Sequence, residues 1–129
     1  MTHPPPDLDR LRQRRALNDR MRKAPLDTRF GRLVIAPAVL DFLNTEPALN
    51  PRHALARSLY LLNALAQFNP FGSASDPSDA HDTGCITLWG RRFCFKIECF
   101  DKSYAGPSPD PANAAVTRRV LTIDFGPDT

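Results

Sequence analysis

The sequence predicts an α+β fold in which a small antiparallel β-sheet is covered by helices on its apolar face. Apolar residues recur at helical spacing in the N-terminal half, whereas short segments of β-branched and aromatic residues alternate with polar ones in the C-terminal half. The 13 prolines fall in clusters that separate these blocks. A chain of 129 residues fits one domain, expected over 7–125, between a flexible N-terminus (1–6) and a short tail (126–129).

The first elements are expected to be a helix, a strand and a second short helix. Helix-favouring residues fill 8–23, with Asp7 as the expected cap and Pro25 as the stop. The segment 32–35 is short and β-branched, as in a strand at the edge of a sheet. Residues 38–44 then predict a brief helix.

The segment 51–68 has the clearest helical pattern of the chain. Pro51 suits a first helical position with Asn50 as its cap. The apolar spacing predicts a core-facing stripe made of Leu55, Leu59, Leu62, Leu65 and Ala66. The following residues, 69–83, are rich in Pro, Gly, Ser and Asp, and this composition predicts a surface loop.

A β-hairpin is expected next, with its turn at Gly90 and Arg91. Pairing Leu88 with Phe93 separates the side chains into two faces. The apolar face then carries Ile86, Leu88, Phe93, Phe95, Ile97 and Cys99, and the mixed face carries Cys85, Thr87, Trp89, Arg92, Cys94, Lys96 and Glu98. A second proline-bounded loop at 103–113 and a third strand at 115–125 complete the predicted sheet.

Basic residues are concentrated near the N-terminus. The net charge is only +3, yet nine basic residues lie between Arg10 and Arg32 against two acidic ones, Asp19 and Asp27. Such a segment can bind phosphates, dock on an acidic protein or form a solvated helix face. The partner-binding candidates in this segment are Arg12, Arg14, Arg15 and Arg22.

The three cysteines predict free thiols in a cytoplasmic protein. Cys85, Cys94 and Cys99 are an odd set without C-x-x-C spacing. The sequence also has no apolar segment long enough for a membrane span and no apolar leader typical of secretion. We therefore expect no membrane association.

The pair His81 and Asp82, at the end of the polar loop, is a candidate catalytic or metal-binding site. Proton transfer or metal binding there would need a third group, from Asp101 or from the turn around Asp110. The alternative is that both side chains stabilise their own loop. Because no phosphate loop, nucleophile triad, zinc spacing or dinucleotide fingerprint is present, the sequence predicts no cofactor, no metal and no enzymatic activity.

The mixed sheet face is the stronger candidate for binding. It should present Trp89, Arg92 and Lys96, joined by Arg118 or Arg119 according to register. An aromatic group among cations can stack a nucleic-acid base or anchor a protein interface. A covering helix or a second subunit is the alternative, so a homodimer also remains open.

Several C-terminal motifs resemble one known family. They are His81-Asp82-Thr83-Gly84, the run from Phe95 to Asp101, Ser108-Pro109-Asp110-Pro111, and the run from Val116 to Ile123. In order and spacing these motifs resemble the DUF3768 family, and a weaker N-terminal match extends the resemblance over about residues 10–123. The resemblance implies small alphaproteobacterial proteins often carried on mobile elements, with no assigned biochemical activity.

Two functions follow as expectations. The first is a small non-enzymatic inhibitor from a mobile element or phage, similar to anti-CRISPR proteins, that binds a host defence protein or complex. The alternative is a nucleic-acid-binding accessory protein that uses the basic N-terminal helix and the mixed sheet face.

Overall fold

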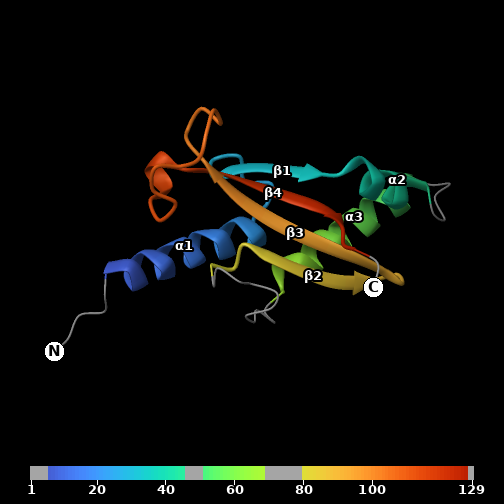
Figure 1. The fold of residues 1–129 in the computed structure, drawn as a ribbon. Helices are drawn as coiled ribbons and strands as arrows, with labels where there is room; N and C mark the ends of the chain where they lie inside the picture. The colour runs from blue at the N-terminus through green and yellow to red at the C-terminus, as the bar shows by residue number, and fades with distance from the viewer. Residues whose placement is uncertain (1–5, 46–50, 69–79, 128–129) are drawn as a thin grey trace.

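The computed structural model describes residues 6–45, 51–68 and 80–127 and confirms the α+β class. Its three helices are α1 (Pro6–Lys23), α2 (Pro37–Thr45) and α3 (Pro51–Ala66). Its four strands are β1 (Gly31–Ile35), β2 (Thr83–Leu88), β3 (Arg91–Phe100) and β4 (Arg118–Phe125), with a short 3-10 turn, η1 (Ala114–Val116), before the last (Figure 1). Most of the predicted loop 69–83 and the Asn50 cap lie outside the described residues.

The sheet has the order β1-β4-β3-β2. As expected, β2, β3 and β4 are antiparallel neighbours and β1 lies at one edge, but β1 pairs with β4 in parallel. A parallel partner needs a long connection, and the chain between β1 and β4 supplies one. The pairing also requires Gly31, because a Cβ at this position would lie 1.7 Å from the carbonyl oxygen of Arg119.

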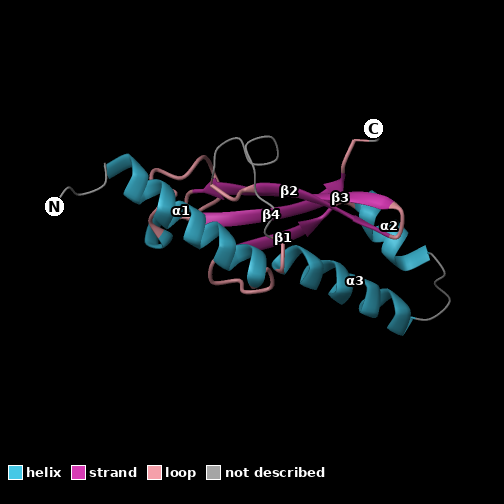
Figure 2. Cartoon of the chain, turned by 90° about the horizontal axis from the view of Figure 1, so that it is seen from below, coloured by secondary structure: helices cyan, strands magenta, loops and turns pink. Residues whose placement is uncertain are grey.

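The helices lie against one face of the sheet. Figure 2 shows α1 passing in front of the strands and α3 beside β1, with α2 near the end where β2 turns into β3. The buried core joins Met21 of α1, Val39 and Leu43 of α2, and Leu61 and Leu65 of α3 to the sheet. The strands contribute Phe93, Phe95, Ile97, Leu121 and Ile123 to this core. The side chains on the opposite face of the sheet are left outside it.

The predicted core stripe of α3 is wrong for Leu55 and Leu59, whereas Leu62 packs against the buried core. Leu65 is buried, but Leu55 and Leu59 are 61% and 52% exposed. The sheet instead selects the neighbouring side of the helix, where Leu61, Leu65 and Phe68 follow one another at intervals of four and three residues. Because leucines occupy both sides, helical spacing alone fits either stripe.

The hairpin is confirmed, but its turn is placed one residue earlier than predicted. Ile86 pairs with Phe93 and Leu88 with Arg91, so Trp89 and Gly90 form the turn. Both have positive φ, 52° and 73°, as in a type I′ turn. The pairing differs from the predicted one by two residues, and this even shift leaves the two strand faces unchanged.

The predicted free thiols are wrong for two of the three cysteines. Cys85 and Cys94 are directly opposed on β2 and β3 and form a disulfide, whereas Cys99 is free. Cross-strand pairing brings the two residues together despite their lack of C-x-x-C spacing. Within the described ranges, no helix has the length and apolarity needed to cross a membrane.

Candidate functional site

A buried polar cluster joins α1 to the sheet. Its centre is Asn18, whose side chain is fully buried. The Asn18 amide donates to the carbonyl oxygen of Ala80 over 2.9 Å and accepts a hydrogen bond from Nε of Arg119 over 2.8 Å. The Arg119 guanidinium is 3% exposed and also donates to the carbonyl oxygen of Pro111. Arg119 was predicted as a partner-binding residue, and its burial by α1 makes that prediction wrong.

Asp19, the next residue of α1, binds two basic side chains. Its carboxylate lies 2.9 Å from Nδ1 of His81 and 2.6 Å from a guanidinium nitrogen of Arg22. Burial by itself would raise the pKa of Asp19, but the hydrogen bonds from Arg22 and His81 outweigh burial and lower it. Arg22 is 3% exposed, so its predicted role in partner binding is also wrong.

Arg14 and Asp82 form the outer part of the same cluster. A guanidinium nitrogen of Arg14 lies 3.4 Å from a carboxylate oxygen of Asp82. Both residues line a cavity of about 470 Å³ that also contains Cys99. Burial raises the pKa of the Cys99 thiol, and the charges of Arg119 and Arg14 offset this only in part. A thiol with a raised pKa is a weak nucleophile at neutral pH.

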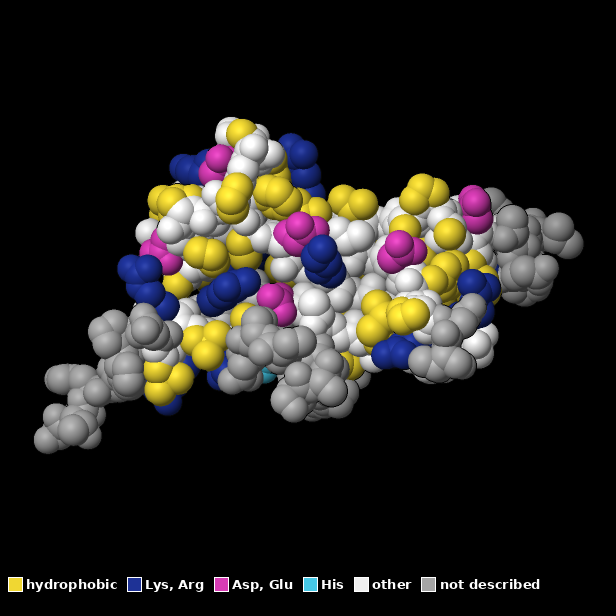
Figure 3. Space-filling view, in the orientation of Figure 1, with side chains coloured by type: hydrophobic (Ala, Val, Ile, Leu, Met, Phe, Trp, Pro, Cys, Tyr) yellow, Lys and Arg dark blue, Asp and Glu magenta, His cyan; other side chains and the backbone are white. Residues whose placement is uncertain are grey.

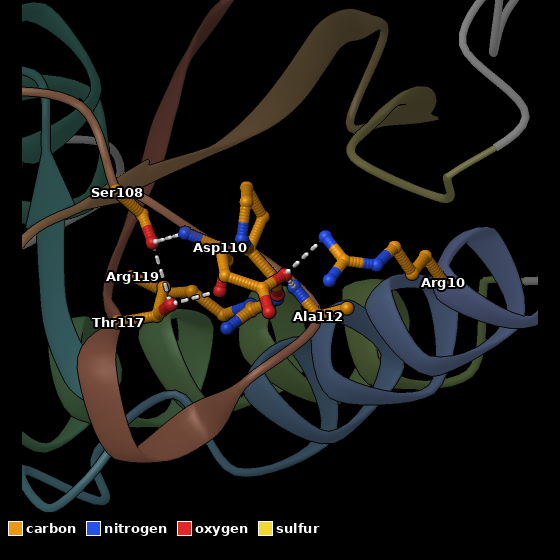
Figure 4. A network of polar contacts seen from close by, with 7 residues as sticks. Arg10, Ser108, Asp110, Ala112, Thr117 and Arg119 are labelled. Carbon is orange, nitrogen blue, oxygen red and sulfur yellow. Dashed lines mark hydrogen bonds and ion pairs between the residues drawn. The ribbon is translucent and has the colours of Figure 1, made fainter. Parts of the chain in front are cut away.

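The proline-bounded loop before β4 forms a turn that is held by hydrogen bonds, as its sequence indicates. Ser108 accepts from the backbone N–H of Asp110 over 3.1 Å, and Thr117 donates to the Asp110 carbonyl oxygen over 2.8 Å (Figure 4). The Asp110 carboxylate accepts from the N–H of Ala112 and lies 3.6 Å from Arg10 of α1. These contacts give Asp110 a structural role.

The four acidic and histidine candidates therefore do not converge on one centre. His81 contacts α1 at Asp19, and Asp82 contacts α1 at Arg14. Asp101 accepts from Ser103 and Ala105 within a separate turn. Across 6–45, 51–68 and 80–127, no group of three or more His, Cys, Asp or Glu side chains is placed to hold a metal ion.

A second site lies at the hairpin turn, and we call it the aromatic–arginine patch: Phe42, Arg57, Tyr60, Trp89 and Arg91. The Trp89 ring lies 5.8 Å from the Tyr60 ring and 6.0 Å from the Phe42 ring, centroid to centroid. The Arg57 guanidinium lies 4.7 Å from the Phe42 ring and 5.2 Å from the Trp89 ring. Arg91 lies 5.3 Å from the Phe42 ring. Three elements, α2, α3 and the hairpin turn, thus build one surface.

Trp89 is exposed but does not lie on the mixed sheet face, where it was predicted. As the first residue of the turn it leaves the strand alternation, and its ring packs against Phe93, a core residue on the helix-covered side. Positive φ is unfavourable for a bulky side chain, by about 1–2 kcal/mol. The ring contacts with Phe42, Tyr60 and Phe93 hold Trp89 in this conformation.

The other residues predicted for the mixed sheet face do lie on it. Arg92 and Lys96 are exposed there, Arg118 is half-buried, and Lys96 lies 3.5 Å from Glu98. Arg12 is exposed and Arg15 half-buried on α1. In Figure 3 basic, acidic and hydrophobic side chains are interspersed over the visible face, without a large patch of one charge. The binding role of these residues stays a prediction.

The sequence reasoning missed Phe42, Arg57, Tyr60 and Arg91. Each belongs to a segment with a correctly predicted element, but their common surface depends on how α2 and α3 pack beside the hairpin turn. The positive φ of Trp89 depends on the same packing. A tryptophan before a glycine at a hairpin turn was the one available signal.

Comparison with known proteins identifies a family without an assigned activity. The family model described as "Protein of unknown function (DUF3768)" matches residues 48–127, from before α3 through β4. Neither a curated protein nor a solved structure matches the chain. The match covers the hairpin, the turn at Asp110 and the last strand, which carry the motifs quoted above. On this basis the chain belongs to the DUF3768 family.

Proposed function

We propose that this chain is a non-catalytic binding protein that docks on another protein through the aromatic–arginine patch. One observation carries the proposal: Trp89 and Tyr60 are 43% and 59% exposed, although their rings are side by side. Trp, Tyr and Arg are the residues most enriched among energetic hot spots of protein interfaces. A preformed aromatic pair also loses little side-chain entropy on binding.

The charges of the patch favour an acidic partner surface. Arg57 and Arg91 stack on aromatic rings, and among the described residues neither forms an ion pair. Arg91 is exposed and Arg57 is half-buried. A guanidinium stacked on a ring can still donate N–H groups to a carboxylate, and Arg91, the exposed one of the two, is the better placed to do so. The expected partner therefore offers carboxylates around an apolar pocket for Trp89.

A bacterial defence complex is the partner class we propose, with this chain as its stoichiometric inhibitor in the cytoplasm. The support is the mobile-element setting that the family resemblance implies, together with a surface suited to binding. The raised pKa of the Cys99 thiol, which makes it a weak nucleophile at neutral pH, supports binding without catalysis. In a reducing cytoplasm the Cys85–Cys94 disulfide is expected to open, and backbone pairing would still hold the hairpin.

Nucleic acid is the less favoured ligand, because the arginines of α1 are largely engaged within the molecule. Arg10 pairs with Asp110, Arg14 with Asp82 and Arg22 with Asp19. Arg20 lies 3.7 Å from the Phe30 ring. Fewer cations are then free to neutralise phosphates than the sequence suggests.

Affinity capture from a nuclease-treated bacterial lysate tests the proposal. Tagged wild-type chain should retain a protein in near-stoichiometric amount, and Trp89→Asn should retain at most about one tenth as much, the effect of losing one hot-spot residue. Asparagine is chosen because Asn-Gly favours the type I′ turn, so the backbone is kept while the ring is removed.

The matched control is Val34→Thr, an exposed apolar residue of β1 on the mixed sheet face. It should capture as much as wild type. Equal capture by Trp89→Asn and wild type would overturn the patch as the binding site. Capture that is seen from an untreated lysate but not from the nuclease-treated one, and that falls steeply with salt, would support the nucleic-acid alternative instead.

A further inference from the structure

A leucine stripe runs along the outer side of α3, and we define it as Leu55, Leu59, Leu62 and Ala66. These residues are spaced by four, three and four positions, the a/d pattern of a two-helix seam. Leu55 and Leu59 are 61% and 52% exposed. Leu55 and Leu59 lie outside the core, and Leu62 packs against its edge, while Leu61 and Leu65 enter the core from the neighbouring side of the same helix.

The stripe borders a groove at its C-terminal end, and at its N-terminal end Leu55 projects into solvent. A groove of about 350 Å³ lies between the stripe and the loop after α1. It is lined by Lys23, Ala24, Pro25, Leu26, Asp27, Leu59, Leu62, Asn63 and Ala66. Leu26, 68% exposed, forms its outer wall. Leu55 lies two helical turns before Leu62, beyond the groove, with its side chain in solvent.

We propose that a second copy of this chain occupies the groove, with the two α3 helices packed antiparallel across a twofold axis near Leu59. In an antiparallel pair, Leu55 of one copy lies opposite the Leu62–Ala66 end of the other. It can therefore enter the groove beside Leu26, and the symmetry repeats the contact. A surface that carries both the projection and the groove is self-complementary, as a twofold interface requires.

The charge distribution favours a copy of α3 over a charged partner. From Ala54 to Ala66 the one charged residue is Arg57, and it packs against Phe42 and Trp89, away from the stripe. Between Ala54 and Ala66 the stripe is uncharged, and the same segment of a second copy matches it. At the groove rim, Lys23 and Asp27 offer one charge of each sign and so create no repulsion between identical copies.

This dimer leaves the aromatic–arginine patch open. Tyr60 and Arg57 lie on one flank of α3, and the helical periodicity places Leu55, Leu59, Leu62 and Ala66 on the other. A dimer through α3 would therefore present two copies of the patch. The interface does not use the mixed sheet face.

Sedimentation equilibrium over about 1–300 µM tests the proposal. Wild type should be a dimer at the upper concentrations, with a dissociation constant in about the micromolar range for an interface of this modest size. Leu59→Asp should raise that constant at least tenfold by placing two carboxylates near the axis. Leu40→Asp, an exposed leucine of α2 outside the stripe, is the matched control and should dimerise as wild type does. Circular dichroism checks that each variant is folded.

A cross-link keeps the test decisive if Leu59→Asp fails to fold. In a Cys99→Ser background, Leu59→Cys should form a disulfide-linked dimer on mild oxidation, and Leu40→Cys should not. A wild-type chain that stays monomeric to 300 µM would overturn the proposal. So would a dimer that survives Leu59→Asp, or one that cross-links equally through position 40.

Discussion

Asp19 shows how one carboxylate serves two elements at once, since it binds Arg22 on its own helix and His81 at the entrance to β2. The lowered pKa means that the folded chain favours the ionised form more than the unfolded chain does. This contribution to stability is fully present above about pH 4, the ordinary Asp pKa in an unfolded chain. It is lost as pH falls through the lower pKa of the folded state.

Asp19→Asn should therefore flatten the acid limb of the stability curve. Between pH 7 and pH 5 the unfolding free energies of wild type and variant should run parallel. Below about pH 4 wild type should lose stability faster, by up to about 1.4 kcal/mol per pH unit for one proton. Urea unfolding at a series of pH values measures this. Acid limbs of equal slope would show that Asp19 does not couple protonation to folding.

Trp89 illustrates a residue whose backbone and side chain have opposing preferences. Trp89→Asn removes the ring but relieves the positive φ, so its unfolding free energy should stay within about 1 kcal/mol of wild type. Trp89→Ala loses the ring and keeps the unfavourable φ, and it should be less stable than Trp89→Asn by about 1 kcal/mol. Thermal unfolding of the two variants, measured side by side, gives this difference in stability. An alanine variant as stable as the asparagine variant would contradict the turn conformation.

At the scale of elements, α1 is attached to the sheet largely by polar groups. Within the described part of the helix, Met21 is its one buried apolar residue, whereas Asn18 and Arg22 are buried polar ones. Asn18→Ala leaves Arg119 without an acceptor for Nε and should cost about 2–4 kcal/mol. Gln13→Ala, exposed on the same helix, should cost less than about 0.5 kcal/mol. Similar costs for the two variants would contradict the role of Asn18 in docking α1.

The hairpin is braced by the Cys85–Cys94 disulfide in addition to its backbone pairing. The two cysteines are separated by nine positions, and closing so short a loop is worth about 2–3 kcal/mol in the chain-entropy account. The double variant Cys85→Ser, Cys94→Ser should keep the native circular dichroism spectrum and lose about this amount of stability. Cys99→Ser controls for the loss of a thiol. Identical unfolding of wild type with and without reductant would contradict the disulfide.

The existence and order of the elements were predictable from the sequence because each has its own local signal. Prolines separate the elements, and alternation identifies the hairpin faces. The errors arise where tertiary packing decides. The core side of α3 depends on which leucines meet the sheet, and the burial of Arg119 depends on Asn18, which lies 101 positions away. The Trp89 conformation likewise depends on Phe42 and Tyr60.

For the molecule as a whole, the distribution of charge matters more than its total. The basic N-terminal segment is partly neutralised by Asp19, Asp82 and Asp110, so α1 functions mainly as a structural element. The exposed binding features concentrate instead around α3, with the aromatic–arginine patch on one flank and the leucine stripe on the other. If the chain binds as proposed, this arrangement would separate attachment to a partner from association with a second copy.

Site-specific photo-cross-linking in living cells tests whether this chain docks through the aromatic–arginine patch. With p-benzoylphenylalanine in place of Tyr60, irradiation should give one discrete adduct between this chain and a different protein. The same group in place of Val34, on the mixed sheet face, should give none. Adducts from position 34 and none from position 60 would contradict the account and return the binding site to the sheet face.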